Sequence, residues 1–131
     1  MMKKKVIIAC LALSFLWIGA KKDDGVITKE NGVYVVNTTS LATDVEGYIG
    51  TTPLKIYIKK NKIQKIEALH NQETPKYFAK IKKQLLDKWG GMTVKEAQKA
   101  QVDGVTGATM SSEAVKENVK RGLDYYQKHK K

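Results

Sequence analysis

The 131-residue sequence has few residues that carry thiol or metal chemistry: one cysteine and two histidines. Cys10 lies in an N-terminal apolar stretch, so residues 21–131 exclude a disulfide framework and a cysteine-based metal site. His70 and His129 lie far apart in the chain and predict no metal site. The sequence also lacks a G-x-G-x-x-G fingerprint and any Ser/His/Asp or paired-carboxylate arrangement. These absences argue against an independent dinucleotide site and against hydrolysis.

The first twenty residues have the layout of a secretory signal peptide. A basic start is followed at residues 6–20 by fifteen mostly apolar residues, and polar sequence begins at Lys21. A helix of that length spans about 22 Å, less than the roughly 30 Å of membrane hydrocarbon. We therefore predict a signal peptide over residues 1–20, with a retained N-terminal anchor as the alternative. Either one implies an exported protein, in the periplasm or on the outer face of the cytoplasmic membrane.

The rest of the chain is strongly basic. Loss of residues 1–20 removes three lysines and leaves 21 basic against 13 acidic residues, a net charge of +8. Such a charge favours an acidic protein partner or the anionic surface of a membrane, although most of the lysines are expected on solvated faces of strands and helices. No nucleic-acid recognition motif is present, so nucleic acid is not an expected partner. Residues 21–31 are predicted to be a polar tether to a domain over residues 32–131.

Hydrophobic patterning predicts a small sheet in the first half of this domain. Residues 32–36 are rich in valine, and residues 45–50 are a second candidate strand that ends at a glycine. Residues 54–59 alternate apolar and polar side chains, which is typical of a half-buried strand. A tight turn at Asn61 is expected to lead to a partner strand at residues 63–70.

The second half of the domain has helical spacing. Thr74 is a good N-cap for a helix over residues 75–89, and a Thr-x-x-Glu capping box opens a short helix over residues 93–100. A final helix is indicated by an apolar stripe, namely Val115, Val119, Leu123 and Tyr126. The sequence therefore predicts an α+β domain, with a small, mostly antiparallel sheet and packed helices.

The loop before the final helix, residues 103–109 (D-G-V-T-G-A-T), combines small residues with hydroxyls. Glycine allows the backbone to approach a ligand closely, and the N-terminus of the following helix favours an anion. Ser111, or alternatively Ser112, is expected to cap that helix, with Glu113 in its first turn. The same composition is also common where a helix simply begins, so the order of the residues matters.

The order D-x-x-T-G-A-T resembles the flavin-attachment motif of the FMN-binding domain family. This family includes small subunits of the sodium-pumping NADH:quinone reductase and of related ferredoxin:NAD reductase complexes. In the family, a flavin transferase moves FMN from FAD onto the last threonine through a phosphoester bond. The resemblance implies covalent FMN on Thr109, with Ser111 among the cofactor-binding residues. It also implies recognition and loop-shape roles for Asp103, Thr106, Gly107 and Ala108.

Two further segments resemble the family in the matching order. Residues 70–75 (H-N-Q-E-T-P) are similar to the Glu-Thr-Pro segment that helps form the flavin pocket, with Lys76 where the family usually has glycine. Residues 46–50 (E-G-Y-I-G), with Pro53, are similar to the start of the family's sheet. The resemblance implies pocket roles for Glu73 and Thr74. The alternative for both residues is an ordinary helix start.

Together these features predict an exported flavoprotein electron carrier that moves electrons between a membrane reductase and a downstream acceptor. The flavin would supply the redox chemistry and the protein its position and electrostatics, so a self-sufficient enzyme is not predicted. The expected partners are the maturing flavin transferase and a membrane oxidoreductase or other redox protein. The alternatives are an accessory FMN-binding subunit of a membrane oxidoreductase complex, or a basic extracytoplasmic binding module without flavin.

Overall fold

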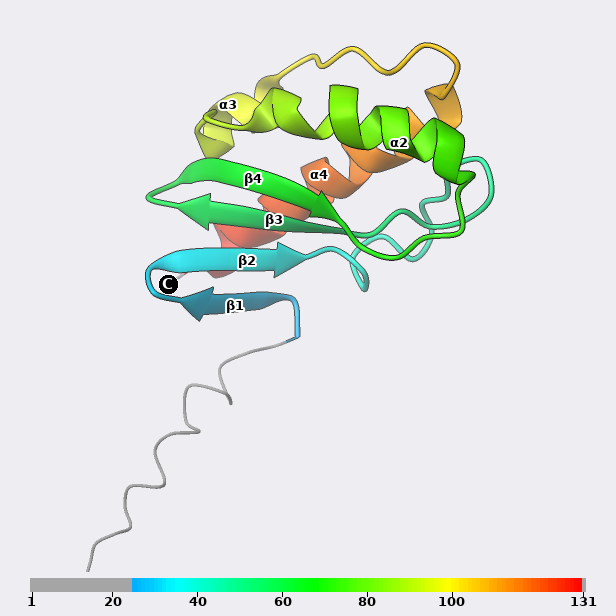
Figure 1. Cartoon of the computed structure of the whole chain (residues 1–131). Coiled ribbons are helices and arrows are strands. Elements are labelled where there is room, and N and C mark those ends of the chain that lie inside the picture. Colours follow the sequence, from blue (N-terminus) through cyan, green and yellow to red (C-terminus); the bar gives the residue numbers. More distant parts are fainter. Residues whose placement is uncertain (1–24, 131) are drawn as a thin grey trace, which may run out of the picture.

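The computed structural model describes residues 25–130 (Figure 1). The predicted signal peptide or anchor, and residues 21–24 of the tether, lie outside the described residues. The described part has a four-stranded antiparallel sheet in the order β1-β2-β3-β4, together with helices α2, α3 and α4 and a short 3-10 helix, η2. The predicted α+β fold is confirmed. No helix within residues 25–130 is long and apolar enough to cross a bilayer.

Two tight hairpins organise the sheet. The strands are β1 (Ile27–Glu30), β2 (Val33–Asn37), β3 (Leu54–Lys59) and β4 (Lys62–Ala68). Both two-residue turns, at residues 31–32 and 60–61, have positive φ at their two central positions. This turn geometry matches the twist of the flanking strands. The predicted hairpin around Asn61 is therefore confirmed.

Strand β1 corrects the predicted tether. The polar composition predicts a tether over residues 21–31, and this is wrong for residues 27–30, which pair with β2 from Ile27↔Val36 to Glu30↔Val33. Edge strands tolerate charged residues because one side of the strand faces solvent. The signal for pairing is the Asn31-Gly32 turn, a strong hairpin sequence, rather than the composition of the strand itself.

The candidate strand at residues 45–50 is also wrong. This segment is a loop whose only ladder contact is an isolated bridge between Glu46 and Thr51, within the part of the chain that the structure describes. The Gly47 N–H donates to the Gly50 carbonyl at 2.8 Å and closes a tight turn. The backbone therefore leaves the sheet here and forms a loop at its end.

The helical elements largely follow the predicted ones. They are α2 (Pro75–Gln84), η2 (Leu86–Trp89), α3 (Val94–Lys99) and α4 (Thr109–His129). Thr74 occupies the N-cap position of α2 as predicted, without a side-chain capping bond. The capping box of α3 is confirmed: Thr93 Oγ1 accepts from the Glu96 N–H at 3.1 Å, and Glu96 Oε1 accepts from the Thr93 N–H at 2.8 Å.

Helix α4 begins earlier than predicted. Ala108 occupies its N-cap position, so neither Ser111 nor Ser112 caps the helix, and Glu113 falls beyond the first turn. The two serine hydroxyls make tertiary contacts instead. Ser111 Oγ donates to Glu73, and Ser112 Oγ accepts from the Val105 N–H at 2.9 Å. The serines therefore attach the start of α4 to other segments.

Helix α4 packs across one face of the sheet and contributes one stripe of side chains to the core. Its predicted stripe is confirmed, since Val115, Val119, Leu123 and Tyr126 are at most 2 % exposed. Gly122 lets the helix approach β3 closely, because a Cβ there would lie 2.7 Å from Ile56 Cδ1. Figure 1 shows the start of α2, the start of α4 and the loop around residues 45–51 meeting at one end of the sheet.

Candidate functional site

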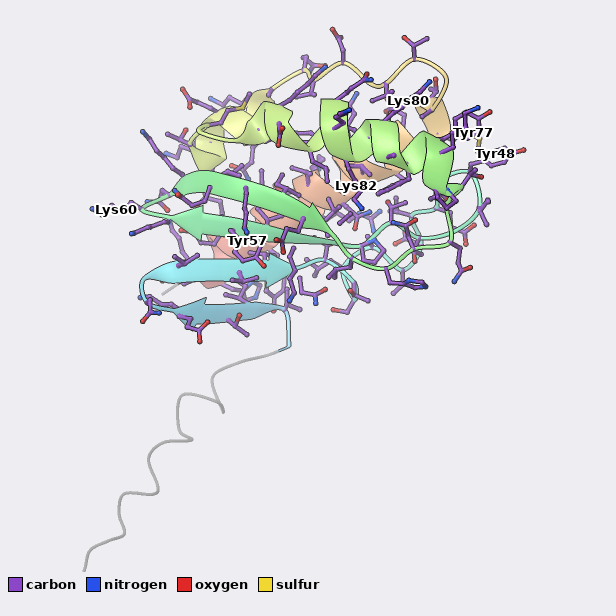
Figure 2. The ribbon with its side chains drawn as sticks, in the orientation of Figure 1. Tyr48, Tyr57, Lys60, Tyr77, Lys80 and Lys82 are labelled. Atoms are coloured by element: carbon purple, nitrogen blue, oxygen red, sulfur yellow. The ribbon has the colours of Figure 1, made fainter. Side chains whose placement is uncertain are left out.

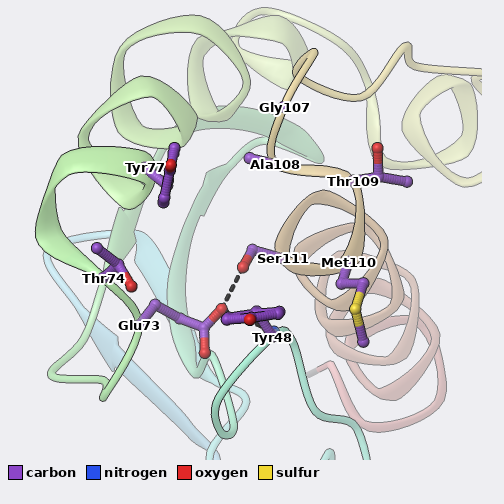
Figure 3. Close-up of a pocket in the computed structure, with 9 residues that line it drawn as sticks. All are labelled: Tyr48, Glu73, Thr74, Tyr77, Gly107, Ala108, Thr109, Met110 and Ser111. Atoms are coloured by element: carbon purple, nitrogen blue, oxygen red, sulfur yellow. Dashed lines mark hydrogen bonds between the residues drawn. The ribbon is translucent and has the colours of Figure 1, made fainter.

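A cavity of about 440 Å³ lies where these three segments meet. Its lining residues come from the 45–51 loop, the start of α2, and the start of α4 with the loop before it: Tyr48, Glu73, Thr74, Tyr77, Gly107, Ala108, Thr109, Met110 and Ser111 (Figure 3). The volume is typical of sites for small molecules and cofactors. Residues from positions 48 to 111 therefore form one site.

The Glu73 carboxylate joins the three segments. Glu73 is only 5 % exposed. Its Oε1 accepts from the Tyr48 N–H at 2.9 Å, and its Oε2 accepts from the N–H groups of Ile49 and Gly50 at 2.7 and 2.9 Å. The Ser111 hydroxyl donates to Oε1, as the dashed line in Figure 3 marks. One side chain thus holds the loop to both helices.

These contacts determine the charge of the carboxyl group. Burial by itself raises the pKa of Glu73, but the hydrogen bonds from Ser111 and the three backbone N–H groups hold this pKa below its ordinary value of 4.5. Glu73 is therefore ionised at neutral pH. Gly47 makes room for it, because a Cβ at that position would lie 2.6 Å from Glu73 Oε1.

The start of α4 forms the opposite wall. Gly107 has a φ of +86°, a backbone conformation that favours glycine. The first helical hydrogen bond runs from the Ser112 N–H to the Ala108 carbonyl at 2.9 Å. Helix geometry therefore leaves the N–H groups of Thr109, Met110 and Ser111 without a helical acceptor. With the helix dipole, they favour an anion at this wall.

Only part of the 103–109 loop reaches the cavity. Thr109, Gly107 and Ala108 line it, and the Thr109 side chain is exposed. Asp103 and Thr106 are exposed and do not line it. The Asp103 carbonyl accepts a hydrogen bond from Lys88 Nζ at 3.4 Å instead. Six of the eight sequence-predicted site residues therefore lie together, and these two lie outside the cavity.

No sequence pattern predicted a site role for the side chains of Tyr48, Tyr77 and Met110. They line the cavity and are 73 %, 46 % and 56 % exposed. A signal was present for Tyr77, which lies one position before the buried Phe78 and so falls at the edge of the apolar face of α2. Tyr48 lies in the 46–50 segment that resembles the family, but that resemblance implied the start of a sheet and not a pocket role. Met110 carried no signal, because its role depends on where a loop and a helix start come together.

The fold and the site define a small α+β domain with a cavity that combines apolar side chains with an anion-favouring helix start. A model of the FMN-binding domain family matches residues 47–124, more than half of the chain. The chain therefore belongs to the FMN-binding domain family and is a flavoprotein that binds FMN. The matched range includes every residue that lines the cavity. No curated protein and no solved structure matches the chain.

Proposed function

We propose that this protein is an exported electron carrier whose FMN is attached to Thr109 through a phosphoester bond. The observation that supports attachment is the position of Thr109. Its exposed side chain belongs to the first residue of α4, at a cavity that the family match encompasses. A hydroxyl in this position is accessible to a maturing enzyme from solvent and is next to the space for the cofactor.

The residues of the cavity fit both halves of FMN. The phosphate would lie against the N–H groups at the start of α4, where the helix dipole stabilises an anion by about 0.3–1 kcal/mol. Gly107 has no side chain to obstruct that approach. Tyr48, Tyr77 and Met110 offer aromatic and thioether surface to a flat ring system. Glu73 has the role of a positioning residue, because it holds the loop that carries Tyr48.

In the attachment reaction, a flavin transferase moves the FMN moiety of FAD onto Thr109. A bond forms between Thr109 Oγ and the phosphorus of the FMN moiety, and the phosphoanhydride bond of FAD breaks. AMP leaves, and the hydroxyl proton passes to solvent. The resulting phosphodiester keeps one negative charge for the start of α4 to stabilise. A covalent link also prevents loss of the cofactor, which suits a protein exported from the compartment that makes FMN.

The bound flavin would supply the redox chemistry, and the chain would supply its position and surroundings. The carrier role is supported by the sequence, which contains no dinucleotide fingerprint of its own. Export is supported by the pattern of residues 1–20.

Co-expression with a flavin transferase tests the attachment. Flavin fluorescence of the protein band should survive a denaturing gel and disappear in Thr109→Ala. Thr43→Ala, at an exposed threonine outside the cavity, is the matched control and should keep the fluorescence. A dark band for the unmodified protein, or a fluorescent band for Thr109→Ala, would refute attachment at Thr109.

A further inference from the structure

We propose that the opening of the FMN cavity and the neighbouring solvent face of α2 form a docking surface for an acidic redox protein. This inference rests on the proposed function, because an electron carrier must bring its flavin close to a partner. Two independent features of the surface support it: a cluster of exposed apolar side chains and a set of unpaired lysines.

The apolar feature is a rim around the cavity. The exposed large hydrophobic residues of the described chain are Tyr48, Ile49, Tyr77 and Met110, between 46 % and 73 % exposed. Three of them line the cavity, and Ile49 follows Tyr48 in the same loop. Single exposed apolar residues are ordinary, but a cluster at one opening is typical of an interaction site. Tyrosine and methionine are also enriched at protein interfaces.

The charged feature is the solvent face of α2. Lys76, Lys80 and Lys83 recur at intervals of four and three residues, so they share one side of the helix, and all three are exposed. Residues 74–86 contain no acidic residue. Among residues 25–130, no ion pair involves a lysine of α2, because the paired cations all belong to other elements. The positive charge of this face is therefore not compensated by ion pairing.

The two features adjoin each other. Tyr77 of the rim lies one helical turn before Lys80, and Figure 2 shows both toward the same end of α2. Of the carboxylates near the rim, Glu73 is buried with four donors and Glu113 pairs with Lys116 at 3.2 Å. Glu46 remains as an exposed carboxylate in the loop. Three lysines therefore dominate the charge on the α2 side of the rim.

An acidic protein fits this surface better than a membrane does. A partner with acidic groups around its own redox centre would complement an apolar rim flanked by lysines, and such complementarity accelerates association. The lysines at the hairpin tip lie at the opposite end of the molecule, near Lys60 in Figure 2. Charge alone would thus give no single orientation on an anionic membrane. Within residues 25–130, only the end of the molecule at the start of α2 combines lysines with exposed apolar side chains at a cavity.

Rapid mixing with a reduced plant-type [2Fe–2S] ferredoxin tests the proposal, since the ferredoxin is an acidic one-electron donor. Two ferredoxins are oxidised for each FMN fully reduced, and the protons come from solvent. At low ionic strength, Lys80→Glu/Lys83→Glu should lower the second-order rate constant about tenfold or more and weaken its salt dependence. The control is Lys59→Glu/Lys62→Glu, a cross-strand pair at the hairpin tip with the same change in net charge. It should change the rate less than twofold.

The outcomes separate the two proposals. Flavin absorbance should be equal in all variants, and absence of attached flavin in the unmodified protein would count against the proposed function instead. Equal loss of rate in both double variants, or no loss in either, would overturn the docking surface. Binding to phosphatidylglycerol vesicles that depends on Lys80 and Lys83, with an unchanged ferredoxin rate, would overturn it in favour of a membrane. Ile49→Ser should slow transfer at high salt, where the apolar contact dominates.

Discussion

The first turn of α4 and the body of the same helix contrast sharply. In the body, Val115, Val119 and Leu123 are buried against the sheet. In the first turn, Thr109 and Met110 are exposed, and the Ser111 hydroxyl bonds to a carboxylate 38 positions earlier in the chain. The body thus anchors the helix through apolar contact, whereas the first turn presents polar groups to a cavity.

This difference shows how a small domain keeps a site open. Exposed N–H groups and hydroxyls contribute little to folding, so the apolar body must hold the first turn in place. Glu73 shares one property with each region: it is buried like the body and polar like the first turn. Substitutions in the three places should therefore separate stability from flavin attachment.

The largest loss of stability is expected in the body. Leu123 is fully buried, so Leu123→Ala should remove about 2–5 kcal/mol of the free energy of unfolding through lost burial and a residual cavity. Urea unfolding monitored by circular dichroism measures the loss. The folded fraction of Leu123→Ala should still acquire flavin, because Thr109 is unchanged. A loss below 1 kcal/mol would contradict the role given to the body.

A smaller loss is expected at the connection between the two regions. Glu73→Gln removes the charged acceptor of four hydrogen bonds and should cost about 1–3 kcal/mol at pH 7. The control is Glu113→Gln, at an exposed ion pair, which should cost less than about 1 kcal/mol.

The stability lost in Glu73→Gln should depend on pH in a defined direction. Because the folded-state pKa of Glu73 lies below 4.5, the unfolded chain takes up the proton first as the pH falls. The stability difference between wild type and Glu73→Gln should be complete above about pH 5 and shrink as the pH falls through the folded pKa. Unfolding curves over this range measure it, and a difference that grows toward low pH would contradict the ionised state.

The two glycines of the loop offer a finer comparison. Gly47→Ala would place a Cβ 2.6 Å from Glu73 Oε1, whereas Gly50→Ala would meet Gln72 Cβ at an ordinary 3.8 Å. We expect Gly47→Ala to cost roughly 1 kcal/mol more than Gly50→Ala, because only the first displaces the carboxylate. It should also slow flavin attachment more. Equal stabilities in denaturant would show that the loop does not depend on this close approach.

The smallest effect on stability is expected at Thr109 itself. Its side chain is exposed, so Thr109→Ala should change the free energy of unfolding of the flavin-free protein by less than about 0.5 kcal/mol. The same substitution should abolish flavin attachment. Thermal unfolding of the two flavin-free proteins checks the first part. A large destabilisation would show that the residue has a structural role and would weaken the contrast within α4.

Local patterns predicted much of the fold. The alternation of residues 54–59, the capping box at Thr93 and the stripe of α4 all proved correct, because each reflects interactions between residues close in the chain. The errors have a common cause. The polar composition of β1 hid the strand despite its Asn31-Gly32 turn, and the 45–50 segment carries only a weak local signal. Both conformations depend on partners elsewhere: β2 for the strand, and Glu73 for the loop.

The sequence by itself determined the family, the periodicity of the core elements and the loop that ends at Thr109, since motif order and spacing are properties of the chain. Only the tertiary structure decided which residues share a cavity. Glu73 meets the N–H groups of residues 48–50 and the Ser111 hydroxyl across separations of 23 to 38 positions. The tertiary structure also placed Tyr48 and Tyr77 at the cavity and Asp103 outside it. Such contacts arise when helices pack on a sheet, and no local pattern encodes them.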